Sequence, residues 1–256
     1  MSTEMKPSDK LTEIINLSRA IGDPQLDFVI LAEGNTSVRT SAGQMLVKAS
    51  GSNMTTAGEQ DFVEVDLTAF MDLVNAGPAS DDDVASMLAA ATIEGLKRPS
   101  VESLLHAVCL QMPGVNAIAH THPTPVNAVL CSDRASCLTE GSMFPDQIVV
   151  MGQNPLLVPY VDPGLPLAQE IHTRLVAHVR EFGTHPKVIY LQNHGMFALG
   201  ATAEEALQIT VMAVKCARVL LGALSIGRPT FLSHQNADRI HTRPDENLRR
   251  GILAAG

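Results

Sequence analysis

The sequence has 256 residues, of which 45% are hydrophobic and 18% charged, which is ordinary for a globular protein and enough for a substantial core. Its formal net charge of −9 argues against nucleic acid or an anionic membrane as partner, because both require a concentrated basic face. The N-terminal residues lack the apolar core of a signal peptide, and no run reaches the about 18 apolar residues of a membrane span. We therefore expect a soluble, cytoplasmic protein.

The first half of the sequence predicts one helix, several short strands and two further helices. Leucine and isoleucine recur at helical spacing after Ser8, a candidate N-cap, until Gly22 and Pro24 end the helix. Alternating apolar residues predict the strands, the first two joined by a turn at 41–43, and Ser100 is a candidate cap of the last helix. The expected elements are a helix at 8–22, strands at 36–40, 44–50 and 61–67, and helices at 81–96 and 101–112.

The second half continues in the same way. The expected elements are a strand at 115–123, an apolar run at 146–152, a helix at 167–183, a strand at 187–195 and a helix at 202–224. Thr202 and Glu205 form a capping box at the start of that last helix. Without a repeat or a long linker, we expect a single domain over 1–256, a three-layer α/β/α sandwich with a central, mostly antiparallel or mixed sheet. Residues 228–256 are polar and form a tail or a lid.

Two histidines stand one residue apart at the end of the strand in the segment VNAIAHTHP. Successive side chains of a strand point to opposite faces, so His120 and His122 share one face and could bind one metal ion. The alternative is a chance pair of histidines on a polar strand face.

A third histidine, His194, ends the apolar segment KVIYLQNH. If both strands belong to one sheet, the three histidines converge at one edge, and three neutral imidazoles with one open position are typical of catalytic zinc. Glu102 adds a carboxylate in the first turn of the preceding helix, which completes a set suited to zinc or another divalent ion. The alternatives are a hydrogen-bonded histidine in a turn and a surface glutamate.

Five short segments in this order resemble the class II aldolase and adducin family: AEGNTSVR, ASG, PSVESLLHA, VNAIAHTHP and QNHG. The resemblance covers about residues 10–222. It implies that His120, His122 and His194 are metal ligands, and that Glu102 is a fourth ligand that swings away to act as acid or base. It also implies a homotetramer with active sites at the subunit interfaces. Enzymes of the family include fuculose-phosphate and rhamnulose-phosphate aldolases and ribulose-phosphate 4-epimerase.

The resemblance also implies a pocket for a substrate phosphate. Glycines let backbone N–H groups approach an anion, and a helix N-terminus offers free donors, although the same residues taken alone are only turn signals. Lys48 could add a cation to this pocket or could be an exposed strand lysine. The implied pocket residues are Gly34, Asn35, Ser50, Gly51 and Ser100.

The sequence departs from the family pattern in two places. Ser100 is followed by Val101, where several sugar-phosphate aldolases have a second serine, so either a phosphate or a carboxylate could be bound. Neither Tyr160 nor Tyr190 stands where the aldolases have a tyrosine proton donor. Asp146 is the alternative proton donor, acting on an adjacent subunit's site, or it belongs to a turn that starts the next segment.

These residues predict a metal-dependent aldolase-type lyase that cleaves a C–C bond of a ketose phosphate or related sugar acid through a zinc-stabilised enediolate. Glu102 would move the proton at the carbon that the cleavage leaves behind. A sugar-phosphate 4-epimerase and a sugar-acid-phosphate decarboxylase are alternatives on the same site. A non-catalytic, adducin-like interaction module is a third, although a scaffold has no physical need for converging imidazoles.

Overall fold

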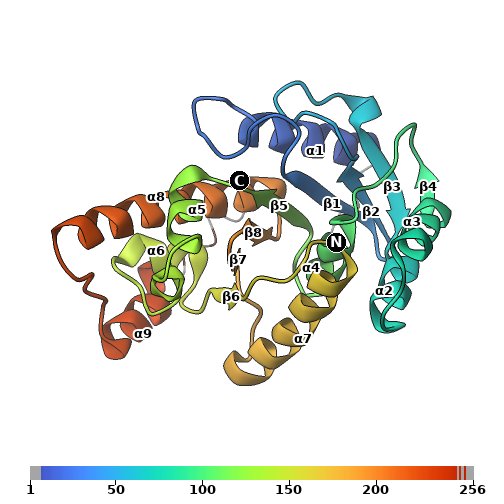
Figure 1. Cartoon of the computed structure of the whole chain (residues 1–256). Helices are drawn as coiled ribbons and strands as arrows, with labels where there is room; N and C mark the ends of the chain where they lie inside the picture. Colours follow the sequence, from blue (N-terminus) through green and yellow to red (C-terminus); the bar gives the residue numbers. More distant parts are fainter. Residues whose placement is uncertain (1–6, 247, 249–250, 252–256) are drawn as a thin grey trace.

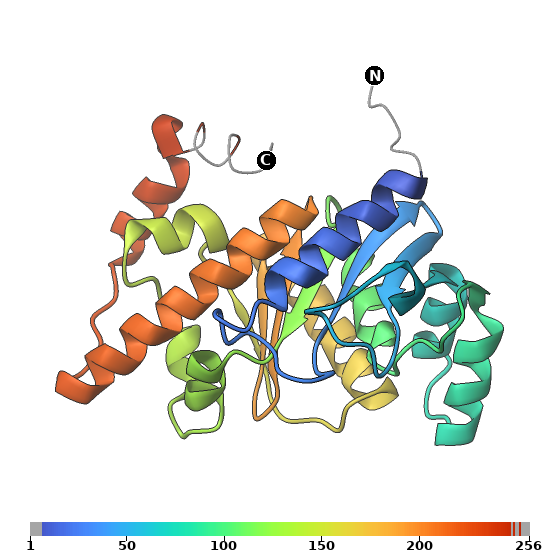
Figure 2. The same cartoon turned by 90° about the horizontal axis from the view of Figure 1, so that it is seen from above.

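The computed structural model describes residues 7–246, 248 and 251, in which a sheet of eight strands lies between two layers of helices (Figures 1 and 2). The strands are β1 (Asn35–Ser41), β2 (Gln44–Lys48), β3 (Phe62–Asp66), β4 (Thr92–Glu94), β5 (Ala117–Thr121), β6 (Leu156–Val158), β7 (Val188–Leu191) and β8 (Gly195–Gly200). Their order in the sheet is β4-β3-β2-β1-β5-β8-β7-β6. β6 and β7 pair in parallel and the other described neighbours are antiparallel, which confirms the predicted α/β/α sandwich with a mixed sheet.

The helices divide between the two faces of the sheet. They are α1 (Pro7–Ile21), α2 (Leu67–Asn75), α3 (Asp81–Ala90), α4 (Ser103–Leu110), α5 (Thr124–Leu130), α6 (Pro145–Met151), α7 (Leu165–Phe182), α8 (Ala203–Ile226) and α9 (His234–Thr242), with 3₁₀ turns η1 (Glu59–Asp61) and η2 (Ala135–Leu138). Helices α1, α5 and α8 share one core cluster, and α2, α3, α4 and α7 share the other. Figure 2 shows α1 and α8 side by side on one face.

Successive side chains of the strands point alternately to the two helical layers, so the same strands contribute to both cores. In β7, Val188 and Tyr190 face the α1–α8 layer, whereas Ile189 faces the α4–α7 layer. The adjacent strand β8 does the same, with Met196 on the first side and Phe197 on the second. Strands buried on both faces read as continuous apolar runs rather than as alternating ones.

Several elements differ from the sequence prediction. The helix expected at 81–96 ends at Ala90, and its last residues form the edge strand β4. The strand expected at 187–195 ends at Leu191, and the unpredicted strand β8 follows it. Helices α2 and α5 were also not predicted, and the apolar run at 146–152 forms helix α6. The first helix begins at Pro7, so Ser8 lies in its first turn instead of capping it.

Helix α8 is long and apolar enough to cross a membrane by length and composition, contrary to the expectation that no segment reaches that length. Its apolar side packs against α1, α5, α6 and β8, where Ile209, Ala213 and Leu220 are buried. This packing explains the composition of α8 as that of a core helix.

Half of the predicted capping box forms at the start of α8. The side chain of Thr202 accepts a hydrogen bond from the backbone N–H of Glu205 at 3.1 Å. The Glu205 carboxylate accepts instead from the N–H of Ala201 at 2.7 Å and pairs with Lys187 at 2.5 Å. Glu205 thus ties α8 to the end of the sheet.

The polar tail after residue 228 includes α9, which packs on α6 through Ile148, Val149, Ala237 and Ile240. Figure 1 shows this pair at the end of the molecule away from α2 and α3. Part of the predicted tail lies outside the described residues, namely 247, 249–250 and 252–256. The same holds for residues 1–6 at the N-terminus, where we expected no signal peptide.

Replacement of Thr202 by alanine should destabilise the protein by about 1 kcal/mol, because the first turn of α8 loses its side-chain acceptor. Urea unfolding followed by circular dichroism measures this change. Ser225→Ala is the control, since that exposed hydroxyl bonds only Gly222 near the other end of α8 and its loss should cost less than about 0.5 kcal/mol. Equal stability of Thr202→Ala and wild type would contradict the role of the cap.

Candidate functional site

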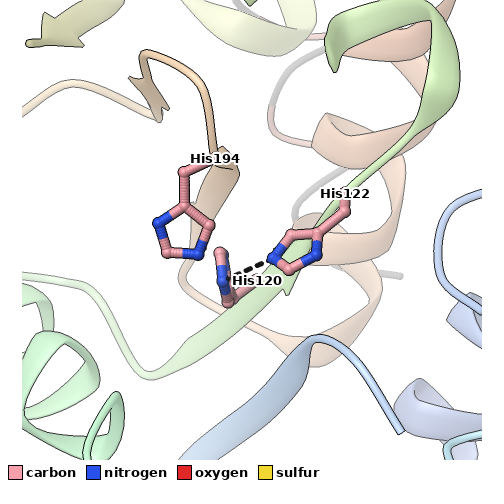
Figure 3. A group of neighbouring side chains, drawn as sticks. All are labelled: His120, His122 and His194. Carbon is pink, nitrogen blue, oxygen red and sulfur yellow. Dashed lines mark hydrogen bonds between the residues drawn. The ribbon is translucent and has the colours of Figure 1, made fainter. Parts of the chain in front are cut away.

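Three histidines converge where β5 and β8 lie side by side in the sheet. His120 is near the end of β5, His122 follows that strand, and His194 lies in the turn between β7 and β8. Because β5 and β8 are antiparallel, the turn that precedes β8 lies next to the end of β5. Figure 3 shows the three rings pointing toward one another.

The ring nitrogens are close enough to share one ion. The Nε2 atoms of His120 and His122 are 3.0 Å apart, and one nitrogen from each of the three rings lies within 4.8 Å of the others. Oε1 of Glu102 is 3.1 Å from Nε2 of His194 and 3.5 Å from Nε2 of His120. The convergence expected from the sequence is therefore present in the structure.

His194 reaches the site from a turn and not from the predicted strand. Its N–H donates to the carbonyl of Leu191 at 3.1 Å, and Asn193 before it has a positive φ of 57°. The side-chain amide of Asn127 donates to the His194 carbonyl at 3.0 Å. These contacts fix a turn that alternation alone does not predict.

Hydrogen bonds on the far sides of the rings determine where the protons lie. Nδ1 of His120 is 3.0 Å from the Met196 carbonyl, and Nδ1 of His122 is 3.2 Å from the Glu33 carboxylate. Both partners only accept, so both Nδ1 atoms carry hydrogen, and in a neutral ring this leaves Nε2 as the nitrogen that can bind a metal ion. Burial, then His120 and His194, lower the pKa of His122 to about 3, which keeps its ring neutral.

When both rings are neutral, the lone pairs of two Nε2 atoms 3.0 Å apart and of the carboxylate oxygen beside them repel one another unless a cation lies between them. Neutral imidazoles whose other nitrogen is hydrogen-bonded, together with one carboxylate, are ligands that zinc and similar divalent ions prefer. The residues present therefore fit a divalent metal.

Glu102 lies immediately before α4, on the layer that His120 faces. Its backbone N–H donates to Oγ of Ser100 at 3.3 Å, but α4 begins at Ser103 with Glu102 as its N-cap, so the predicted cap at Ser100 is wrong. Burial raises the pKa of the Glu102 carboxyl, but the neighbouring His120 and His194 lower it by more, so this pKa lies well below its usual range. Glu102 is thus ionised at neutral pH.

Two glycines of the expected anion pocket have positive φ angles. Gly34, at 66°, also lies so close to the strand of His120 that a Cβ atom would stand 2.7 Å from the His120 carbonyl oxygen. Gly51, at 74°, faces open space in an exposed turn with Ser50. The N–H of Ser50 donates to the Arg98 carbonyl at 3.0 Å, which ties this turn to the segment that precedes Ser100 and Glu102.

Gly195, the first residue of β8, is a third glycine in tight contact with the site. A Cβ atom at this position would stand 2.5 Å from Cδ2 of His122 and 2.5 Å from the Thr121 carbonyl oxygen. The backbone of β8 can therefore approach the histidines only because residue 195 has no side chain.

Lys48 is buried, with 2% of its surface exposed, so the alternative of an exposed strand lysine is wrong. Its ammonium group donates to the carbonyls of Ser52 at 2.5 Å and Ala32 at 3.4 Å. These carbonyls belong to the segments next to Gly51 and Gly34. A positive charge therefore lies between the two glycine turns.

Asn35, part of the Gly34–Asn35 turn predicted for the anion pocket, directs its side chain toward Glu102. Its amide nitrogen donates to Oε2 of Glu102 at 2.8 Å and its amide oxygen contacts Nε2 of His106. With both polar atoms occupied and 3% of the residue exposed, the side chain of Asn35 holds Glu102 instead.

Asp146 lies in the first turn of α6, behind the N-cap Phe144, and the main packing partners of α6 are α8 and α9. Its proposed action on a neighbouring subunit stays a prediction.

The two tyrosines of the chain lie apart from the histidines. Burial raises the pKa of the Tyr190 hydroxyl, and the exposed Tyr160 donates a hydrogen bond to Asp162 at 3.0 Å. Neither tyrosine has a described contact with the histidines.

Three residues of the site were not predicted from the sequence. Glu33 lies within the quoted AEGNTSVR segment, yet only the fold reveals its contact with His122. The ring of Phe197 stacks on His120 with centroids 4.2 Å apart. His106 stands one helical turn after Glu102, and this spacing was the available signal.

A model of the family described as Class II Aldolase and Adducin N-terminal domain matches residues 12–221. The uncharacterized oxidoreductase YuxG of Bacillus subtilis is 27% identical over 191 residues, which are 71% of this chain and 25% of YuxG, so the chain spans about a quarter of that protein. A methylthioribulose-1-phosphate dehydratase of Pseudomonas syringae pv. tomato is 29% identical over 185 residues, 68% of this chain and 76% of the dehydratase. The solved structure of an L-fuculose 1-phosphate aldolase has a TM-score of 0.69 at 22% identity and covers 94% of this chain and 98% of its own.

The stability of the metal-free protein should depend on the titration of Lys48. Burial, the largest influence, lowers the pKa of Lys48 to about 8 from 10.5. Between these two values the unfolded chain binds more protons, so the free energy of unfolding should rise with pH, by about 3 kcal/mol in total. Below about pH 8 both states are protonated and this contribution is constant.

The measurement is urea unfolding at pH 7.5 to 10, with Lys48→Met as the matched variant because methionine has a similar length and no charge. Wild type should gain stability relative to Lys48→Met across this window. Parallel curves for the two proteins would contradict the buried, charged state of Lys48.

Proposed function

The chain belongs to the class II aldolase and adducin family, and from this we propose that it is a divalent-metal-dependent lyase acting on a ketose phosphate or a related sugar acid. The observation that carries the proposal is the convergence of three ring nitrogens and the Glu102 carboxylate, with the Nε2 atoms of His120 and His122 3.0 Å apart. A non-catalytic interaction module would gain nothing from such a buried, mutually repelling set.

His120, His122 and His194 would hold the metal, with Glu102 as the fourth ligand before substrate binds. Zinc suits this set of donors, and another divalent ion of similar preference would also fit it. When bound, such an ion supplies Lewis-acid chemistry, drawing electron density from hydroxyl and carbonyl oxygens of a substrate.

Glu102 is the proposed acid and base. In C–C cleavage the hydroxyl of the leaving fragment gives its proton to a base, the role proposed for Asp146 of a neighbouring subunit, and its carbon becomes an aldehyde. The electron pair of the broken bond passes to the carbon beside the substrate carbonyl, giving an enediolate. Glu102 takes a proton from solvent and delivers it to that carbon. Oε1 faces the histidines and is the oxygen of the carboxylate directed toward the site.

The anionic end of the substrate would lie between the two glycine turns. Gly34 and Gly51 have no side chains, so a phosphate or carboxylate could approach their backbone closely, and Ser50 and Ser100 would add hydroxyl groups. The buried ammonium group of Lys48 between these turns supports an anionic ligand.

A second candidate is the loss of water from a ketose phosphate, which the similarity to a methylthioribulose-1-phosphate dehydratase favours. Here Glu102 would remove a proton from the carbon beside the carbonyl, and the hydroxyl on the next carbon would leave as water after protonation. The first half of this reaction uses the same carboxylate in the same position. A 4-epimerase and a decarboxylase pass through a similar enediolate.

We further propose a cytoplasmic homotetramer in which a neighbouring subunit completes the site and contributes Asp146. Ile30 and Leu31 are 61% and 80% exposed on the loop that leads to Glu33. Exposed apolar residues beside a polar site are typical of a surface that another protein covers. This supports an interface next to the histidines.

His120→Ala and His194→Ala should each lose the metal, because a site with one ligand fewer binds a divalent ion far more weakly. Elemental analysis after dialysis against zinc and then buffer should give about one ion per chain for wild type and much less for both variants. His172→Ala on α7 is the control and should keep the ion. Equal metal in all four proteins would contradict the assignment.

Glu102→Gln should keep the fold and much of the metal, yet lower turnover by at least about 100-fold, because an amide cannot carry a proton between substrate atoms. The metal-loaded protein is incubated with a panel of ketose phosphates and sugar acids, and products are identified by mass and NMR. Aldehyde fragments indicate cleavage, loss of water a dehydratase, an inverted hydroxyl an epimerase and carbon dioxide a decarboxylase. Undiminished turnover in Glu102→Gln would remove this residue from the reaction.

A further inference from the structure

A chain of buried hydrogen bonds lies behind Glu102. The amide nitrogen of Asn35 donates to Oε2 of Glu102 at 2.8 Å, and the amide oxygen of Asn35 contacts Nε2 of His106. Nδ1 of His106 is 2.7 Å from Oγ of Ser37. Ser37 and His106 are fully buried and Asn35 nearly so, so no solvent competes for these bonds.

Two regular spacings build this chain. Asn35 and Ser37 are two residues apart on β1 and therefore face the same layer. Glu102 and His106 are four residues apart at the start of α4, which places them one above the other on the helix. The rings of His106 and Phe197 pack edge to face, with centroids 5.2 Å apart, and this contact limits rotation of the His106 ring.

The chemistry of each group sets the direction of the bonds. An ionised Glu102 only accepts, so the amide nitrogen of Asn35 must face it and the amide oxygen must face His106. That oxygen also only accepts, so Nε2 of His106 carries the hydrogen. Nδ1 is then bare and accepts from the Ser37 hydroxyl, which requires a neutral ring. Burial lowers the pKa of His106 to about 3 and so keeps the ring neutral.

We propose that His106 is a positioning residue, which through Asn35 fixes Oε2 of Glu102 and leaves Oε1 to exchange the proton with substrate. Without the donor on Nε2, the Asn35 amide can rotate and turn its oxygen toward the carboxylate, which would push Glu102 away from its place. The inference rests on the proposed role of Glu102 in proton transfer.

Two replacements of His106 separate positioning from packing. The amide nitrogen of glutamine can occupy the place of Nε2 and donate to Asn35, whereas the shorter asparagine reaches only the place of Nδ1. Both lose the ring that packs on Phe197. We expect His106→Gln to keep kcat within about threefold of wild type and His106→Asn to lose about tenfold or more, with KM little changed in both.

A second measurement does not depend on activity. In metal-free protein labelled with ¹⁵N-histidine, His106 should show a protonated Nε2 and a bare Nδ1, with the signal assigned from the His106→Gln variant. Ser37→Ala removes the donor to Nδ1 and should raise the population of the other tautomer. Ser18→Ala is the matched control, because Ser18 is equally buried but bonds Thr36 at 2.6 Å, and it should leave the tautomer unchanged.

Equal kcat in His106→Gln and His106→Asn, or a wild-type ring protonated on Nδ1, would overturn the proposal. Should His106→Asn fail to fold, the ¹⁵N spectra of wild type and Ser37→Ala decide it alone. The failure of the Glu102 role is distinguishable, since it would appear as undiminished turnover in Glu102→Gln while the His106 tautomer remained as described.

Discussion

Strand β5 is hydrogen-bonded to β1 on one side and to β8 on the other, and the register of these two antiparallel pairings decides which residues meet. Asn35 lies opposite His120 across the first pairing, and Phe197 lies opposite it across the second. A slip of one residue would turn His120 toward the other helical layer and replace it with Thr121. The same pairing brings the turn that carries His194 to the end of β5. The site therefore depends on strand register before any side-chain contact.

This register also creates an electrostatic conflict. In neutral rings the lone pairs on Nε2 of His120 and His122 face each other, and the Glu102 carboxylate faces the same point. A cation removes that repulsion, so its binding and the stability of this end of the sheet are linked. Contacts with Glu33 and Met196 orient the rings beforehand, which lowers the cost of reorganisation on binding.

Local patterns in the sequence predicted those parts of the site that depend only on local geometry. Alternation placed His120 and His122 on one face. It failed for β8, because a strand buried on both sides does not alternate, and its residues could equally extend the preceding segment. The sequence did not decide whether Lys48 lies in the pocket or is exposed, because the carbonyls that accept its hydrogen bonds belong to two distant turns. The only sequence signal for His106 was its position four residues after Glu102. Its hydrogen-bond partners on β1 become evident once α4 is packed against that strand.

Gly34 and Gly195 stand on opposite sides of the histidine strand, and neither position has room for a Cβ atom. The inner wall of the site at these two positions is therefore bare main chain, which offers the same surface to every ligand. Discrimination between ligands must come from the outer loops and from whatever covers Ile30 and Leu31. For the proposed lyase, such a division means that changes at the rim alter which ligand is recognised, while the residues around the histidines stay unchanged.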